Sequence, residues 1–204
     1  MFIFQRGGDQ MKVLISTIWK GSAVIQAIKL FSPNKVFFIA DEPVEDIRNN
    51  SINMIKELFP NLEYKTVPTK IYDIVGIAKS VMDIIESETG NEIIVHISEG
   101  RKTMSLGLLF GAYVKRELVS SAYYITEETN TPIQLPIIKL KLSKQKIRLL
   151  QKINEDISSM PEFEKALNVK APTIYVHMKE LRDDGFLNKE NKLTEIGRII
   201  LLNN

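Results

Sequence analysis

The sequence contains no cysteine and only two histidines, His96 and His177, which lie far apart along the chain. The absence of cysteine excludes a disulfide framework and thiolate zinc sites, and it fits a reducing compartment such as the cytoplasm. Two isolated histidines make a histidine-based metal site improbable. We therefore expect neither a metal nor another cofactor.

Long apolar runs are also missing. The longest, Met104–Val114, has about half of the roughly 20 residues that a membrane helix needs. The opening "MFIFQRGGDQ" lacks the basic segment and the apolar core of a signal peptide, and we assign residues 1–10 no function. Met11 opens "MKVLIST", a natural beginning for a first strand. A cytoplasmic protein without a membrane partner is expected.

Neither half of the chain carries a strong excess of one charge. The net charge is +2, with 11 cationic and 9 anionic side chains from Ser143 onward and 16 of each before it. A protein that binds nucleic acid mainly by charge would have a stronger positive field.

The first half alternates apolar, β-rich runs with helical patterns. Strands are predicted at residues 12–17, 35–40, 62–67, 92–97, 119–125 and, as an edge strand, 137–142. Helices are predicted near residues 22–31, 44–58, 71–88 and 102–117. This order predicts an α/β domain over residues 11–142, a Rossmann-like parallel sheet with helices on both faces. Ligands of such sheets lie beyond the carboxyl ends of the strands, where the loops at 17–22 and 98–102 would meet.

The pattern changes near Leu142. Three short helices are predicted, with Ser143 as an N-cap and Pro161 and Pro172 in first turns. "FLNKENKL" follows as a small β-wing, and a last helix starts at Thr194. These elements predict a winged helix-turn-helix domain over residues 143–204.

The segment "SEGRKTMS" at 98–105 has several features of a phosphate-binding site. It lacks the spacing of a P-loop and of a dinucleotide fingerprint. It retains one glycine for a tight turn, the amides of a helix start and two cations, Arg101 and Lys102. Solvated loop charges are the alternative. Gly107 and Gly111, one turn apart, predict close packing on the sheet or, alternatively, a homodimer contact.

The loop after the first strand adds further candidates. Ser16 and Thr17 end the strand, and Ser22 is a candidate cap for the next helix. Trp19, the only tryptophan, is placed either to stack a base or to be partly buried against the domain. Lys20 would add a cation or be solvated.

The chain resembles the CRISPR-associated Rossmann-fold (CARF) family in two features. The first strand ends in Ser-Thr, and the fourth is followed by [ST]-x-G-x-K-x-M-S, here Ser98, Gly100, Lys102, Met104 and Ser105. A winged helix after the sheet is similar to archaeal CRISPR-locus transcription regulators of that family. Many members have Gly-Gly-Thr-Lys where this chain has Glu99-Gly100-Arg101-Lys102, and a carboxylate there would weaken anion binding unless it points away or pairs with Arg101.

The resemblance implies a homodimer that binds a cyclic oligoadenylate in antiviral defence. An isologous dimer presents each loop twice, so a ring of four or six nucleotides can share its two-fold axis, and we favour cyclic tetra-adenylate. The ligand-binding residues would be Thr17, Trp19, Ser98, Gly100, Arg101, Lys102 and Thr103.

Some relatives also cleave the ring by attack of a ribose 2′-OH on its own phosphate, without a metal. Lys102 would then stabilise charge and Ser16 would position the reacting groups, while His96 is interpreted as a hydrogen-bonded core residue. Whether the chain is an enzyme, a ring nuclease, stays open.

DNA binding follows from the predicted winged helix, whose third helix would face the major groove. The candidate contacts are Lys170, Thr173, Tyr175 and Lys179. Val176 and the acidic Asp183 and Asp184 argue against a strong DNA site, and the module would otherwise only dimerise or close the pocket. Three classes stay open: a ligand-responsive regulator, preferred here; a ring nuclease; and an unrelated nucleotide-binding α/β protein.

Overall fold

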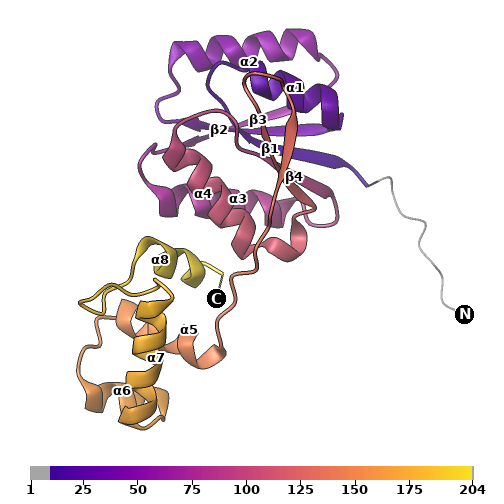
Figure 1. The fold of residues 1–204 in the computed structure, drawn as a ribbon. Coiled ribbons are helices and arrows are strands. Elements are labelled where there is room, and N and C mark those ends of the chain that lie inside the picture. Colours follow the sequence, from indigo (N-terminus) through magenta and orange to yellow (C-terminus); the bar gives the residue numbers. More distant parts are fainter. Residues whose placement is uncertain (1–9, 204) are drawn as a thin grey trace, which may run out of the picture. The chain divides into compact units, whose positions relative to one another are not determined.

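The computed structural model describes residues 10–203 (Figure 1). The chain divides into two compact units, the first ending at Ile138 and the second beginning at Lys139. The sequence placed this boundary four residues later, after Leu142. The interpretation of residues 1–10 falls, apart from Gln10, outside the described residues.

The first unit is built on one six-stranded sheet. Its strands are β1 (Lys12–Thr17), β2 (Lys35–Asp41), β3 (Glu63–Thr69), β4 (Glu92–His96), β5 (Ser121–Ile125) and β6 (Pro132–Leu135). The order is β3-β2-β1-β4-β5-β6, and the first five are parallel. The central strands are buried on both faces, which explains their continuous apolar sequence.

Helices cover both faces of the sheet. They are α1 (Ser22–Phe31), α2 (Asp46–Leu58), α3 (Ile74–Ser87) and α4 (Lys102–Val114), with a 3-10 turn at Arg116–Leu118. Alternate residues of β1 enter different cores: Val13 and Ile15 pack with α3 and α4, whereas Leu14 packs with α1 and α2. The predicted α/β class, a mostly parallel sheet flanked by helices, is confirmed.

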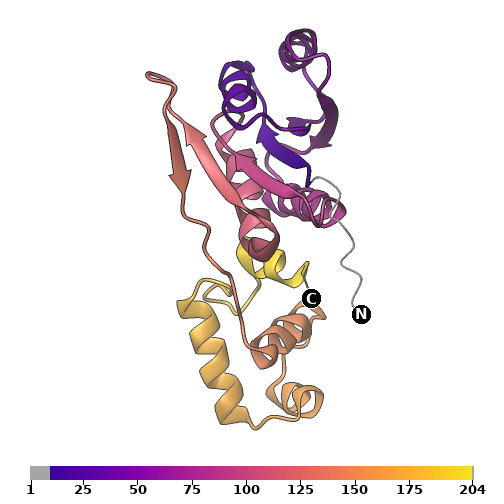
Figure 2. The same cartoon turned by 90° about the vertical axis from the view of Figure 1, so that its right-hand side faces the viewer.

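The predicted sixth strand at 137–142 is wrong. The chain reverses directly after β5, and β6 pairs antiparallel to it (Figure 2). The turn closes with Thr126 N–H donating to Thr131 O at 3.0 Å, and Asn130 takes a left-handed φ of 52°. Pro132 is tolerated because it is the first residue of an edge strand. This hairpin brings a polar turn to the edge where β1 and β4 end.

Helix α4 packs closely against α3 through its two glycines. A Cβ at Gly107 would lie 2.7 Å from Ile77 Cβ, and one at Gly111 would lie 2.8 Å from Ala78 O. The predicted close approach therefore occurs, with α3 rather than the sheet as partner. The glycine face is used within the chain and is not free for the alternative role in a homodimer.

Over its described residues, 139–203, the second unit has four helices around a small core. They are α5 (Lys144–Asn154), α6 (Met160–Leu167), α7 (Ala171–Asp183) and α8 (Glu195–Leu201). The predicted cap of α5 is present, because Ser143 Oγ accepts from Lys146 N–H at 3.3 Å. Thr194, expected to be the first residue of the last helix, is its N-cap, and its Oγ1 accepts from Gly197 N–H at 3.2 Å. Between α7 and α8, Leu187 and Leu193 form one antiparallel bridge. Within residues 10–203, no helix combines the length and apolarity that a membrane crossing requires.

Candidate functional site

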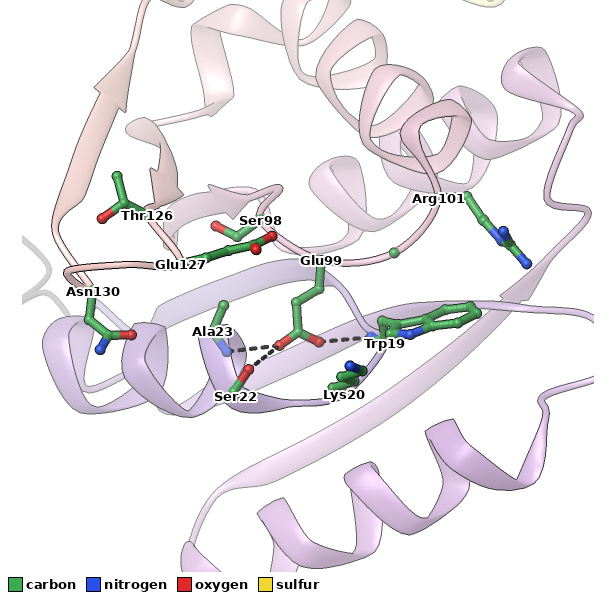
Figure 3. A pocket seen from close by; sticks show the side chains of 11 residues that line it. Trp19, Lys20, Ser22, Ala23, Ser98, Glu99, Arg101, Thr126, Glu127 and Asn130 are labelled. Carbon is green, nitrogen blue, oxygen red and sulfur yellow. Dashed lines mark hydrogen bonds between the residues drawn. The ribbon is translucent and has the colours of Figure 1, made fainter.

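A pocket lies where the sheet reverses its order of winding. Helix α1 follows β1 and α4 follows the neighbouring β4, but the two helices cover opposite faces. The strand ends therefore leave a crevice, the usual ligand position in such sheets. The cavity measures about 540 Å³. Its lining comprises Trp19, Lys20, Ser22, Ala23, Ser98, Glu99, Gly100, Arg101, Thr126, Glu127 and Asn130 (Figure 3).

The start of α1 is occupied by the side chain of Glu99. Its Oε2 accepts from Trp19 N–H at 2.8 Å and from Gly21 N–H at 2.7 Å, and its Oε1 accepts from Ala23 N–H at 2.8 Å. Ser22, the predicted cap, is instead the first helical residue, and its hydroxyl only reaches Oε1 at 3.5 Å. The helix is thus capped by a residue 78 positions away from the N-cap Gly21.

The β4–α4 loop is held tightly by neighbouring strands. Thr17 Oγ1 donates a hydrogen bond to Glu99 O, and Ser98 Oγ accepts from Ile125 N–H at 2.6 Å. Gly100 takes a φ of 82°, and a Cβ there would lie 3.2 Å from Thr17 Cβ. These contacts explain why positions 17 and 98 carry hydroxyl side chains and why position 100 is a glycine.

Trp19 contacts two guanidinium groups. Arg101 Cζ lies 4.9 Å from the centroid of its rings and Arg48 Cζ lies 3.9 Å from it. Arg48 is fully buried, with Nε 2.9 Å from Asp41 Oδ1 and Nη1 2.8 Å from Glu45 Oε2, although neither contact has hydrogen-bond angles. The indole is therefore half-buried, and a stacking base would compete with Arg101 for it.

The start of α4 differs from that of α1. Its N-cap, Arg101, is exposed and has no acceptor atom with which to cap the helix. Lys102 and Thr103 are the first helical residues, whose N–H groups have no acceptor within a helix. The Thr103 hydroxyl donates to Ile71 O at 2.6 Å, and the exposed Lys102 lies outside the lining of the cavity.

Ser16 and His96 form a buried pair beneath the pocket. Ser16 Oγ donates to Thr17 O at 2.8 Å and lies 2.8 Å from His96 Nδ1, and both residues are 0% exposed. Burial lowers the pKa of His96 to about 4, so the ring is neutral at pH 7. Its Nε2 has no hydrogen-bond partner within residues 10–203. His96 is thus the hydrogen-bonded core residue that was expected, and the Ser16 hydroxyl does not reach the pocket surface.

Four lining residues were not found from sequence: Ala23 in the first turn of α1, and three residues of one turn. Thr126, Glu127 and Asn130 come from the β5–β6 turn and form the wall opposite Trp19 (Figure 3). Their position after β5 could have identified them, because polar residues that follow neighbouring parallel strands lie at the same edge of the sheet. They were missed because the sixth strand was predicted at 137–142, which left the turn after β5 unrecognised.

The candidate DNA-contacting residues Lys170, Thr173, Tyr175 and Lys179 are exposed along or beside α7. Two acidic groups near them are paired: Lys146 Nζ lies 3.3 Å from Glu180 Oε2 and 3.7 Å from Asp184 Oδ2. Hydrogen bonds from His177 and then Lys146 lower the pKa of Glu180. Within the described part of the chain, no group of three or more acidic or histidine side chains is arranged to hold a metal ion.

The strand order and the position of the pocket define a Rossmann-like α/β protein with a cavity at its switch point. A family model described as "HFX_2341_N:-like, N-terminal" matches residues 21–130, more than half of the chain. The chain belongs to this family. No curated protein sequence matches it.

Several solved structures are similar. Protein VC1899 from Vibrio cholerae shares 10% identity at a TM-score of 0.52, covering 95% of this chain and 64% of that one. Can2 from Sulfobacillus thermosulfidooxidans in complex with cyclic tetra-adenylate has 10% identity, a TM-score of 0.47 and coverages of 94% and 63%. A type III CRISPR defence DNA nuclease activated by cyclic oligoadenylate shares 9% identity at a TM-score of 0.49, covering 87% of this chain and 36% of that one. VC1899 supports the fold alone, and the chain spans less than two thirds of each of these structures.

Proposed function

We propose that the chain is a CARF-type sensor that binds a cyclic oligoadenylate, cyclic tetra-adenylate in the first instance, and regulates transcription. The observation that carries the proposal is the pocket at the ends of β1 and β4, beside which α4 begins with a basic pair. The motif that resembles the CARF family, residues 98–105, spans the loop into α4 and the first turn of that helix.

The charges of the pocket suit a nucleotide with its phosphate at one end. Arg101 and Lys20 line it near the starts of α4 and α1. The first amides and the dipole of α4 favour an anion, whereas the amides at the start of α1 are bound by Glu99. Glu127 and Asn130 line the hairpin side, where a carboxylate and an amide suit the donors of a base or ribose. Lys102 stands just outside this lining, in a position to face a phosphate of the ring shared with a second protomer.

The dimer is part of the proposal. One chain presents Arg101 and Lys102 once, whereas cyclic tetra-adenylate has four phosphates. Two copies related by a two-fold axis would present Arg101 and Lys102 twice to a ring that has the same symmetry.

The second unit is proposed to be a winged helix-turn-helix that binds promoter DNA. Helix α7 would be the recognition helix, with Lys170, Thr173, Tyr175 and Lys179 as contacts. The pairing of Asp184 and Glu180 with Lys146 reduces the acidic repulsion that the sequence suggested.

Ring cleavage is the alternative activity, with Lys102 stabilising charge and Ser16 positioning the reacting groups. The burial of Ser16 favours binding over cleavage, because its hydroxyl is engaged inside the sheet. The third class is an unrelated nucleotide-binding α/β protein. For its Rossmann dinucleotide mode Glu99 is an obstacle, since the carboxylate occupies the amides that would hold a pyrophosphate.

Incubation with labelled cyclic tetra-adenylate tests the proposal. Intact bound ligand supports a sensor, linear products support a ring nuclease, and absence of binding contradicts both. Lys102→Ala should abolish binding, whereas Lys56→Ala, an exposed lysine on α2, should not change it. A gel shift with promoter DNA at a stated salt concentration tests the second unit.

A further inference from the structure

We infer that the β1–α1 loop is an anion-binding nest whose resident anion is Glu99, and that this contact positions the β4–α4 loop for ligand binding. The first part concerns the chain alone. The second part rests on the proposed function.

The geometry of the nest is that of a phosphate site filled by a side chain. Both carboxylate oxygens accept short hydrogen bonds, and the three amide donors come from one loop and the first turn of α1. Gly21 makes the convergence possible because its φ of 84° turns the chain so that the amides of Trp19, Gly21 and Ala23 face one point. The positive end of the α1 dipole adds to this attraction for an anion.

Glu99 is held from its main chain as well. Its carbonyl oxygen accepts from Thr17 Oγ1, and Ser105 Oγ, which donates to Ile97 O at 3.1 Å, lies 3.4 Å from it. Glu99 thus joins the end of β1, the start of α1 and the first turn of α4. Arg101 follows two residues later, so its direction depends on this anchor (Figure 3).

Two consequences follow from an internal anion at this position. A ligand phosphate is excluded from the start of α1 and is left to Arg101, Lys102 and the amides of α4. From sequence, the Glu99 carboxylate was expected to weaken the site. Instead it points away from Arg101 and Lys102, because its oxygens accept hydrogen bonds from three backbone amides of the β1–α1 segment. Glu99 is therefore a positioning residue and does not contact the ligand phosphate.

Thermal unfolding tests the nest without any nucleotide. Glu99→Ala should lower the Tm by about 5–10 °C, since three charge-assisted bonds are lost. Sodium acetate should raise the Tm of this variant relative to sodium chloride of equal ionic strength, because acetate refills the nest. Wild-type protein and the control Glu127→Ala, which removes another carboxylate of the same pocket, should show no acetate effect. Equal Tm values of Glu99→Ala in acetate and chloride would overturn the nest.

Ligand binding tests the positioning role, well below the Tm of each variant. We expect Glu99→Ala to bind cyclic tetra-adenylate at least tenfold more weakly than wild type, with recovery in acetate and none in chloride. Glu99→Gln, which keeps the shape and loses the charge, should also bind more weakly. Unchanged or tighter binding by both variants would overturn the positioning role. Failure of the wild type to bind contradicts the proposed function and leaves the thermal result to decide the nest.

Discussion

Helices α1 and α4 begin beside the same pocket, after neighbouring strands, yet their first turns are satisfied in opposite ways. The amides at the start of α1 are bound by Glu99. The start of α4 carries Arg101 and Lys102 and has no acidic side chain in its first turn. Cations at this end of a helix cost about 0.3–1 kcal/mol each through the dipole, so the pair does not serve the stability of α4, and the proposed function assigns it to an external anion. The comparison sets a structural anion site beside a proposed ligand site.

The largest effect should come from removing the cations of α4. Arg101→Ala combined with Lys102→Ala should leave no measurable binding of cyclic tetra-adenylate, a loss of more than about 100-fold, because charge-assisted hydrogen bonds contribute about 1.5–3 kcal/mol each. Isothermal titration calorimetry measures the loss, with Lys56→Ala as the control. A folded double variant with wild-type affinity would remove the functional role assigned to α4.

Strands β1 and β4, which precede α1 and α4, are joined by the contact between Ser16 and His96. Because His96 is buried, the stability of the fold depends on pH. The pKa of His96 is lowered to about 4 in the folded chain, against about 6.5 when unfolded. The unfolded chain therefore binds the extra proton between these values, and stability falls as the pH drops from 6.5 towards 4. The fall amounts to at most about 3 kcal/mol.

Urea unfolding at several pH values measures this component. The His96→Asn variant cannot bind a proton at this position, so it should lose the fall in stability between pH 6.5 and 4. The His177→Asn variant should retain that fall. If the free energy of unfolding depended on pH in the same way in wild type and in His96→Asn, protonation of His96 would not be coupled to folding.

A smaller effect is expected on the α1 side of the pocket. Lys20 lines the cavity, but the amides next to it are already bound to Glu99. Lys20→Ala should therefore weaken ligand binding by only about 2–5-fold, through loss of one exposed, solvent-screened charge contact. Direct titration compares it with Arg101→Ala. A loss as large as that of Arg101→Ala would show that both helix starts bind the ligand.

The smallest signal should be optical. Trp19 is the only tryptophan and lies 4.9 Å from Arg101 Cζ, so its emission reports on the position of that side chain. Ligand binding should draw Arg101 to a phosphate and change the emission intensity. The change should be absent in Arg101→Ala titrated to saturation; an identical change there would point to direct stacking of a base on the indole.

Much of the fold follows from local pattern. The buried strands β1, β2 and β4 are continuous apolar runs, and the caps at Ser143 and Thr194 are local side-chain contacts. The hairpin after β5 was missed because its turn uses Asn130 at positive φ without a glycine, and the apolar run at 137–142 looked more like a strand than Pro132–Leu135 did.

The site was only half accessible to sequence reasoning. The strand-end rule identified the loops that carry Trp19 and Arg101. The cap of α1 could not be found, because Glu99 is distant in sequence and its partners are backbone amides that no residue type marks. Likewise, whether Ser16 faces the pocket or the core depends on the pairing of β1 with β4, which places it opposite His96.

A crystal structure of the chain with cyclic tetra-adenylate tests the central claim most directly. We predict phosphates against Arg101, Lys102 and the first amides of α4, with the Glu99 carboxylate still on the amides of Trp19, Gly21 and Ala23. A phosphate in place of Glu99 at the start of α1, or a ligand bound away from this pocket, would contradict the account.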